Sequence, residues 1–213
     1  MIVDERVSCY IKSLTAYNSD FLEKLREKAL EAKVPIIKRE TESFLKTLLL
    51  LKKPKRILEV GAAVAYSSLV MAETLKGNVK ISTIENYEKR VLEARKNIAD
   101  SHYSNIIHLI EEDASKVLKE LVEKEEKYDF IFMDAAKGQY INWLEPVIKL
   151  LNKEGVLCSD NVLQGGDIVQ SRYLIERRDR SIHSRLREYL YELTHREELS
   201  TTILSLGDGV ALT

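Results

Sequence analysis

Five short apolar runs alternate with amphipathic stretches in this chain. The runs that read as strands are residues 56–60, 81–85, 106–110, 130–134 and 156–160. Strands that alternate with helices predict a parallel sheet with right-handed crossover helices, which is the doubly wound α/β architecture. Ligands bind such a sheet at the carboxyl ends of its strands, so we expect the functional residues there.

The N-terminal part of the chain has a helical pattern instead. Apolar side chains recur every three or four positions over residues 7–14 and 21–29, which predicts two helices. Pro35 interrupts this pattern, and a third helix is expected between it and Pro54. Residues 1–53 are therefore predicted to form a helical layer.

The pattern of the C-terminal part of the chain differs from the alternation of strands and helices before it. A helical stretch at residues 184–193 is followed by two strand-like runs, joined by the sequence Gly-Asp-Gly at residues 207–209. This pattern predicts an antiparallel hairpin. Since no low-complexity linker interrupts the chain, we expect one domain over residues 1–213, with its α/β core over 54–213.

Composition narrows the class of protein. With 213 residues and 45% apolar side chains, the chain can form one sizeable core. A formal charge of -1 excludes the strongly basic proteins that coat nucleic acid without selectivity. Cys9 and Cys158 lack zinc-type spacing and a disulfide framework, which favours a reducing cytoplasm. No run resembles a signal peptide or a membrane span, so no membrane partner is expected.

The end of the first strand predicts a cofactor loop. Glu59 and Gly61 come at this strand end, and a helix begins soon after them. Gly61 has no side chain, so a ligand can lie directly over its peptide, close to the free N–H groups of the helix. An ordinary tight turn between a strand and a helix has the same pattern.

Two further strand ends support a cofactor that contains adenosine. Glu85 follows Gly61 by 24 residues, where a carboxylate can accept both ribose hydroxyls. Asp113 and Ala114 follow the third strand, where they can contact an adenine edge. The alternatives are a solvated glutamate at position 85 and a helix N-cap at Asp113.

The next two strand ends predict a metal site. Asp134 ends the fourth strand, and Asp160 with Asn161 ends the fifth. Neighbouring strands lie about 4.8 Å apart, so these three oxygen-bearing side chains can converge on one cation. Two carboxylates and an amide suit a hard ion such as Mg²⁺. Alternatively, the two aspartates cap the helices that follow them.

Four stretches of the sequence carry a family resemblance. They are VPII near residue 35, DAAKGQY from Asp134, DNVL from Asp160 and the closing TTILSLGDGVAL. In them the chain resembles the metal-dependent class I O-methyltransferases of the caffeoyl-CoA and catechol type, and among these the bacterial tRNA 5-hydroxyuridine methyltransferases. The resemblance implies S-adenosylmethionine and Mg²⁺ or another divalent cation as cofactors, and a homodimer. It also implies a Rossmann-like seven-stranded sheet in the order 3-2-1-4-5-7-6, with the last strand antiparallel.

The resemblance also assigns roles to single residues. It implies that Asp134, Asp160 and Asn161 hold the metal. It makes Lys137, beside the substrate hydroxyl, and Asp134 the catalytic residues. The positions that match the cofactor-binding residues are Ile37, Glu59, Gly61, Tyr66, Ser67, Glu85, Asp113, Ala114 and Asp134. Ala65 departs from the family, which usually has a second glycine there; alanine fits only where the backbone needs no positive φ.

These residues predict methyl transfer to an ionised hydroxyl oxygen. The metal would lower the pKa of the hydroxyl, and a neutral Lys137 could take its proton. Alternatively, Lys137 is an ammonium that balances the carboxylates. Chelation favours an acceptor with two adjacent oxygens, which both a catechol and 5-hydroxyuridine possess.

A basic segment after Asn161 bears on the choice of acceptor. Its arginines are Arg172, Arg177, Arg178, Arg180, Arg185 and Arg187. They could hold tRNA phosphates while Tyr140 or Tyr173 stacks on an unstacked base, and His183 in the same segment is a candidate contact to the substrate. The simpler alternative is a solvated helix face.

With the resemblance, the arginines favour methylation of 5-hydroxyuridine at the wobble position of tRNA as the predicted function. Three alternatives stay open: O-methylation of small catechol-like or caffeoyl-CoA-like molecules, a nicotinamide-dependent oxidoreductase, and a non-catalytic RNA-binding module on a methyltransferase fold. The oxidoreductase would explain Gly61 and Glu85, but it gives no reason for the metal residues.

Overall fold

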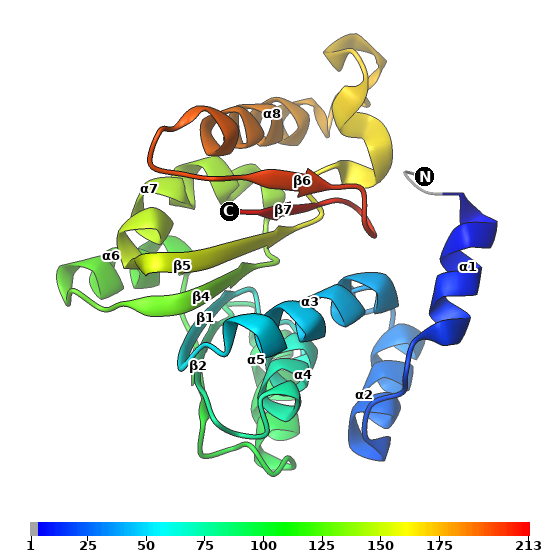
Figure 1. Ribbon diagram of the computed structural model, residues 1–213, viewed down its shortest axis with the longest axis vertical. Helices are drawn as coiled ribbons and strands as arrows, with labels where there is room; N and C mark the ends of the chain where they lie inside the picture. Colours follow the sequence, from blue (N-terminus) through cyan, green and yellow to red (C-terminus); the bar gives the residue numbers. More distant parts are fainter. Residues whose placement is uncertain (1–3) are drawn as a thin grey trace.

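A seven-stranded sheet runs through the centre of the molecule in the computed structural model, which describes residues 4–213 (Figure 1). The strands are β1 Arg56–Val60, β2 Lys80–Ile84, β3 Ile107–Ile110, β4 Tyr128–Met133, β5 Leu151–Asp160, β6 Thr202–Leu204 and β7 Val210–Leu212. Their order is β3-β2-β1-β4-β5-β7-β6. The first five strands are parallel, and β7 is antiparallel to both of its neighbours. The predicted sheet order and the predicted C-terminal hairpin are therefore confirmed.

Helices cover both faces of the sheet (Figure 1). The α-helices are α1 Glu5–Leu14, α2 Asp20–Glu31, α3 Arg39–Lys52, α4 Tyr66–Thr74, α5 Glu88–Ala99, α6 Ala114–Glu123, α7 Tyr140–Leu150 and α8 Arg180–His195. Three short 3-10 turns are η1 Lys137–Gln139, η2 Gln164–Val169 and η3 Arg172–Leu174. The predicted N-terminal helical layer consists of α1, α2 and α3, and α1 and α2 lie at the outer edge of the molecule.

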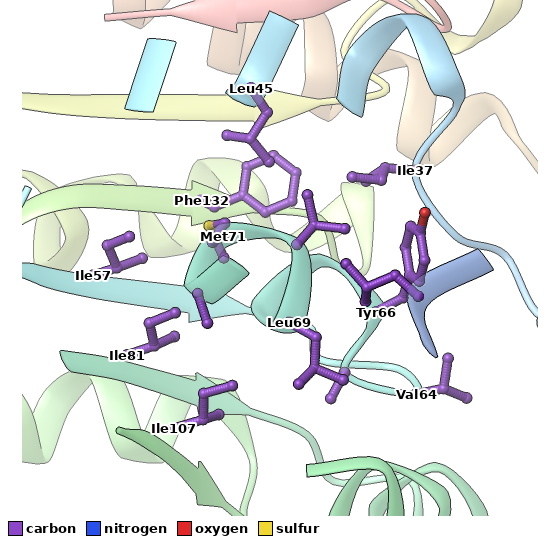
Figure 2. Packing of buried hydrophobic residues seen from close by; sticks show 14 of the residues in the cluster. Ile37, Leu45, Ile57, Val64, Tyr66, Leu69, Met71, Ile81, Ile107 and Phe132 are labelled. Carbon is purple, nitrogen blue, oxygen red and sulfur yellow. The ribbon is translucent and has the colours of Figure 1, made fainter. Parts of the chain in front are cut away.

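Two apolar clusters form the core, one on each face of the sheet. Helices α2 to α5 contribute to one cluster, and Figure 2 shows Leu45 of α3 and Phe132 of β4 among its members. Helices α6 to α8 contribute to the other, together with Ile131 and Met133 of β4. Neighbouring residues of β4 thus face opposite clusters, as alternation along a strand requires, and both faces are buried as in other parallel sheets.

The element bounds differ from the predicted ones near β5. This strand begins at Leu151, earlier than the predicted residue 156, because α7 passes directly into it at its C-cap. The pairing of β4 with β5 has an irregularity between Tyr128 and Phe130. Pro146 lies inside α7, where proline removes one backbone hydrogen bond, and the helix continues through it.

Among the described residues, 4–213, the helices are all too short or too polar to span a lipid bilayer.

Candidate active site

A cavity of about 1160 Å³ opens at the carboxyl ends of the parallel strands. The residues that follow all five of these strands line it, and the segment 35–38 before α3 forms another part of its wall. Ile37 in this segment is buried, and its carbonyl oxygen accepts a hydrogen bond from the guanidinium of Arg26 at 3.1 Å. The site thus lies where a doubly wound sheet is expected to bind ligands.

The loop after β1 lies close to the loop after β4. Gly61 has a φ of 102°, and a methyl group on it would overlap the carbonyl oxygen of Asp134. The N–H groups of Gly61 and Ala62 both donate to the carbonyl of Ile84, at 3.1 and 3.0 Å. Only glycine fits this close approach and this backbone conformation at once.

Ala65, the departure from the family pattern, adopts the left-handed conformation. It is the N-cap of α4 with a φ of 62°, so the condition under which alanine would fit without strain is not met. Its N–H donates to the carbonyl of Ala62 at 2.7 Å, and its side chain is completely buried. The surrounding structure imposes this conformation at a cost of about 1–2 kcal/mol for a residue with a Cβ.

Glu59 lies beneath the cofactor loop and does not line the cavity. Its side chain is fully buried, and its carboxylate accepts hydrogen bonds from the hydroxyls of Ser67, Ser68 and Thr83. Burial raises the pKa of Glu59 to about 7, although the three hydroxyl donors oppose this shift. Direct contact between Glu59 and a ligand is therefore a wrong prediction: the residue holds the first turn of α4 against the sheet.

Tyr66 and Ser67, also predicted to bind the cofactor, do line the cavity. The Tyr66 hydroxyl donates to Glu42 at 2.7 Å, and the Ser67 hydroxyl donates to Glu59. Burial raises the pKa of Tyr66 further above its ordinary value. The hydroxyls of both residues are thus used inside the protein, and their side chains shape the wall.

The predicted adenosine contacts also lie on the cavity wall. Glu85 accepts hydrogen bonds from the backbone N–H groups of Ala63, at 2.8 Å, and of Asn86, at 3.0 Å. Asp113 caps α6 by accepting from the N–H of Ser115 at 2.9 Å, as the alternative interpretation expected. Asp113 and Ala114 nevertheless face the cavity, so capping and ligand contact do not exclude each other.

Asp134 and Asp160 end adjacent strands at the same level. Met133 pairs with Ser159 in the parallel register, so the next residues, Asp134 and Asp160, lie side by side at the ends of neighbouring strands. Asp160 is only 3% exposed. Burial, and next the nearby charge of Asp134, raise its pKa to about 7.

The groups around these carboxylates fit a hard cation. Asp160 accepts from the N–H of Asn161 at 2.8 Å, and the Lys137 ammonium lies 2.7 Å from Asp134. Residues 4–213 contain no cluster of three His, Cys, Asp or Glu side chains suited to a metal, and the predicted set includes only two carboxylates, with the amide of Asn161 as its third member. Carboxylate and amide oxygens are the donors that Mg²⁺ prefers.

Two residues predicted to contact tRNA are buried in the core. Tyr140 has no exposed surface; its hydroxyl donates to the Met133 carbonyl at 2.9 Å, and its ring packs edge-on against Tyr189. His183 is 1% exposed. The predictions that Tyr140 stacks on a base and that His183 contacts RNA are therefore wrong, because α7 and α8 turn these side chains inward.

The predicted arginine contacts have mixed surroundings. Arg177 and Arg178 are exposed, and Arg178 forms ion pairs with Glu176 and Asp179, as on a solvated face. The guanidinium of Arg180 is partly buried and donates to the Ile175 carbonyl at 3.0 Å. Asp179 and Ile175 line the cavity, so this segment borders its mouth.

Sequence reasoning missed several residues of the cavity wall. They are Lys38, Asn86, Trp143, Gln164 and Asp208. Two sequence signals existed: Asp208 lies between two glycines in the hairpin turn, and Gln164 follows the DNVL motif and precedes two glycines. The oxygen of the Gln164 side-chain amide is buried without a hydrogen-bond partner. Trp143 donates a hydrogen bond to the Ser115 hydroxyl at 3.0 Å. It lies inside α7, where the sequence pattern predicts that an aromatic residue belongs to the core.

Comparison with known proteins defines the class. The fold is similar to that of an S-adenosylhomocysteine-bound methyltransferase from Podospora anserina, which is 25% identical, with a TM-score of 0.86 and coverage of 98% of this chain and 93% of that one. The protein is an S-adenosylmethionine-dependent methyltransferase. More narrowly, it belongs to the O-methyltransferase family, whose model matches residues 12–213.

Two further relatives are of the caffeoyl-CoA and catechol type. A catechol O-methyltransferase from Niastella koreensis is 30% identical over 168 residues, which cover 78% of this chain and 76% of the relative. A structure from Staphylococcus aureus, assigned provisionally as a caffeoyl-CoA O-methyltransferase, is 31% identical, with a TM-score of 0.88 and coverage of 98% of both chains.

The strain at Ala65 predicts a stabilising substitution. Ala65→Gly should raise the free energy of unfolding by about 0.5–1 kcal/mol, because glycine adopts positive φ without a steric cost. The matched control is Ala62→Gly in the same loop. Ala62 does not have a positive φ, so this substitution should lower the free energy of unfolding by a similar amount. Urea denaturation measures both, and an equal loss in the two variants would contradict strain at Ala65.

The buried carboxylate of Glu59 predicts a pH-dependent stability. Its pKa is raised from 4.5 to about 7 in the folded protein, so the unfolded state binds fewer protons between these values. The free energy of unfolding should therefore fall as pH rises from about 4.5 through 7. Glu59→Gln lacks this contribution, so its stability relative to the wild type should increase by a few kcal/mol between pH 5 and pH 8. Parallel pH profiles of the two proteins in guanidinium denaturation would refute this prediction.

Proposed function

We propose that this protein methylates one hydroxyl of a small aromatic molecule that carries two adjacent oxygens, with the help of a divalent cation. The observation that carries the proposal is the placement of Asp134, Asp160 and Asn161 in the same cavity as Gly61 and Glu85. That these residues line one cavity supports a metal site and an adenosine site next to each other.

A small acceptor agrees better with the site than a tRNA does. Of the two tyrosines expected to stack on an unstacked base, Tyr140 is buried in the core and Tyr173 is exposed; His183, the suspected substrate contact, is also buried. Residues 35–38 and residues of η2 lie on the wall of the same cavity as the candidate metal site. Tyr173, Arg177 and Arg178 still favour RNA, because they are exposed in the segment that borders the mouth of the cavity. A relative named for its action on catechol supports the small acceptor.

We propose that the cofactor lies along the ends of β1, β2 and β3. Gly61 leaves space over its peptide, and the carboxylate of Glu85 faces the cavity for the ribose. Asp113 and Ala114 would then border the adenine, while Ile37 would cover the methionine end. When bound, S-adenosylmethionine supplies an electrophilic methyl group on a sulfonium.

The cation would be held by Asp134, Asp160 and Asn161. When bound, a divalent ion supplies Lewis acidity toward two neighbouring oxygens of an acceptor. The buried carboxylate of Asp160 gains a counter-charge in this way. Lys137 lies beside Asp134 as an ammonium, and its side chain would take the proton of the acceptor hydroxyl only in the neutral form, which gives up the ion pair with Asp134.

The acceptor class can be tested with labelled S-adenosylmethionine. We expect Mg²⁺-dependent methylation of a catechol such as 3,4-dihydroxybenzoate and none of 4-hydroxybenzoate, which lacks the adjacent hydroxyl. Asp160→Asn should lower kcat/KM at least about 100-fold, because it weakens the cation site. The control is Asp20→Asn, an exposed aspartate in the first turn of α2.

Three results would contradict this proposal. Turnover of catechol that survives both EDTA and Asp160→Asn would exclude the cation site. Equal turnover of the monohydroxy compound would exclude chelation of two oxygens. Methylation of tRNA containing 5-hydroxyuridine, without any turnover of catechols, would establish the RNA function in place of the small acceptor.

A substitution of Lys137 can separate the effect of its charge from a role in proton transfer. Lys137→Arg keeps a positive charge beside Asp134, but a guanidinium cannot take up a proton from the acceptor. If Lys137 is the proton acceptor, kcat should fall by about 10²–10⁴ with little change in KM for the acceptor. Steady-state kinetics with a catechol measure kcat and KM for both proteins. If Lys137→Arg keeps most of the wild-type kcat, the role of Lys137 is purely electrostatic.

A further inference from the structure

The turn of the C-terminal hairpin lies against the loop that carries Asn161. The N–H of Val162 donates to the carbonyl of Gly209, and the N–H of Leu163 donates to the carbonyl of Asp208, both at 3.0 Å. These bonds join the turn that precedes β7, the antiparallel neighbour of β5, to the residues directly after β5. The conformation of the loop after Asp160 therefore depends on the hairpin turn.

Both glycines of this turn are required by their surroundings. Gly207 has a φ of 58°, and a Cβ there would lie 2.6 Å from the hydroxyl oxygen of Thr41 in α3. Gly209 has a φ of 94°, and a Cβ there would overlap Leu163. The turn is thus held between α3 and the loop after β5, which leaves Asp208 little freedom to move.

The carboxylate of Asp208 reaches into the cavity and binds two groups. One oxygen accepts a hydrogen bond from the side-chain amide of Asn161 at 3.2 Å. The other lies 2.6 Å from the ammonium of Lys38. The Lys38 side chain is 47% exposed, so this ion pair contributes little to stability. The bond to Asn161 is the more consequential one, because it acts on a proposed metal ligand.

An asparagine can present either its oxygen or its nitrogen to a neighbour, and only the oxygen can bind a cation. Because the nitrogen of Asn161 donates to Asp208, its oxygen is the end left for another partner. Groups that orient metal ligands in this way commonly contribute a 10–100-fold increase in metal affinity.

We propose that Asp208 is a positioning residue that fixes the amide of Asn161 for binding a divalent cation. This inference rests on the proposed metal site. Asp208 acts through Asn161 by accepting a hydrogen bond, so its role requires an acceptor atom at this position rather than a negative charge.

Titration with Mn²⁺, followed by the electron paramagnetic resonance of the free ion, tests this role without any turnover. Asp208→Ala removes the acceptor, and we expect Mn²⁺ to bind about 10–100-fold more weakly. Asp208→Asn is the matched variant: it keeps an acceptor oxygen but loses the charge, and its Mn²⁺ affinity should stay within about threefold of the wild type. The affinity for S-adenosylhomocysteine, measured by calorimetry, should change less than about threefold in both variants, which a general loss of structure would not allow.

The outcomes separate this inference from the proposed function. If the wild type does not bind Mn²⁺, the proposed metal site fails. If the wild type binds it and Asp208→Ala binds it equally well, the positioning role fails. If Asp208→Asn binds as weakly as Asp208→Ala, charge rather than orientation is the cause, which also overturns the inference. Should Asp208→Ala not fold, Asp208→Ser, whose hydroxyl is too short to replace the carboxylate, takes its place with the same expectations.

Discussion

The structure of the site depends on the burial of Asp160 beside Asp134. Adjacent parallel strands that end at the same level bring the two carboxylates together, and Asp160 is almost completely shielded from water. Burial of a carboxylate next to a second, partly exposed carboxylate is unfavourable unless other groups compensate the charges. The Lys137 ammonium and the N–H of Asn161 provide part of this compensation. A divalent cation would provide the rest, which is why we propose a metal-assisted reaction.

The same sheet end couples the metal side of the cavity to the cofactor side. Gly61 lies against the carbonyl of Asp134, so a shift of the loop after β1 would also displace the loop after β4. Glu59 anchors the first loop from below through Ser67 and Ser68. Methyl transfer requires that donor and acceptor are held in line, and this direct contact between the loops gives both the same rigid support.

The sequence predicted most of the site residues that lie at the ends of strands, but it did not predict which helix residues are buried in the core. Alternation of strands and helices located Asp134 and Asp160, because a residue after a strand must lie at the sheet edge. Tyr140 and His183 read as candidate ligand contacts, since a sequence does not show which face of a helix is turned inward. Asp208 read only as part of a turn, because its role arises from contacts between distant segments. The homodimer and the tRNA partner stay predictions.

The measurement that tests this account most directly is a crystal structure with Mn²⁺ and S-adenosylhomocysteine, in which anomalous scattering locates the ion. The account predicts one strong anomalous peak bounded by carboxylate oxygens of Asp134 and Asp160 and by the amide oxygen of Asn161. The ribose of the cofactor product should lie at Glu85 in the same cavity. A peak elsewhere, or none in crystals in which the cofactor product is clearly bound, would contradict the account.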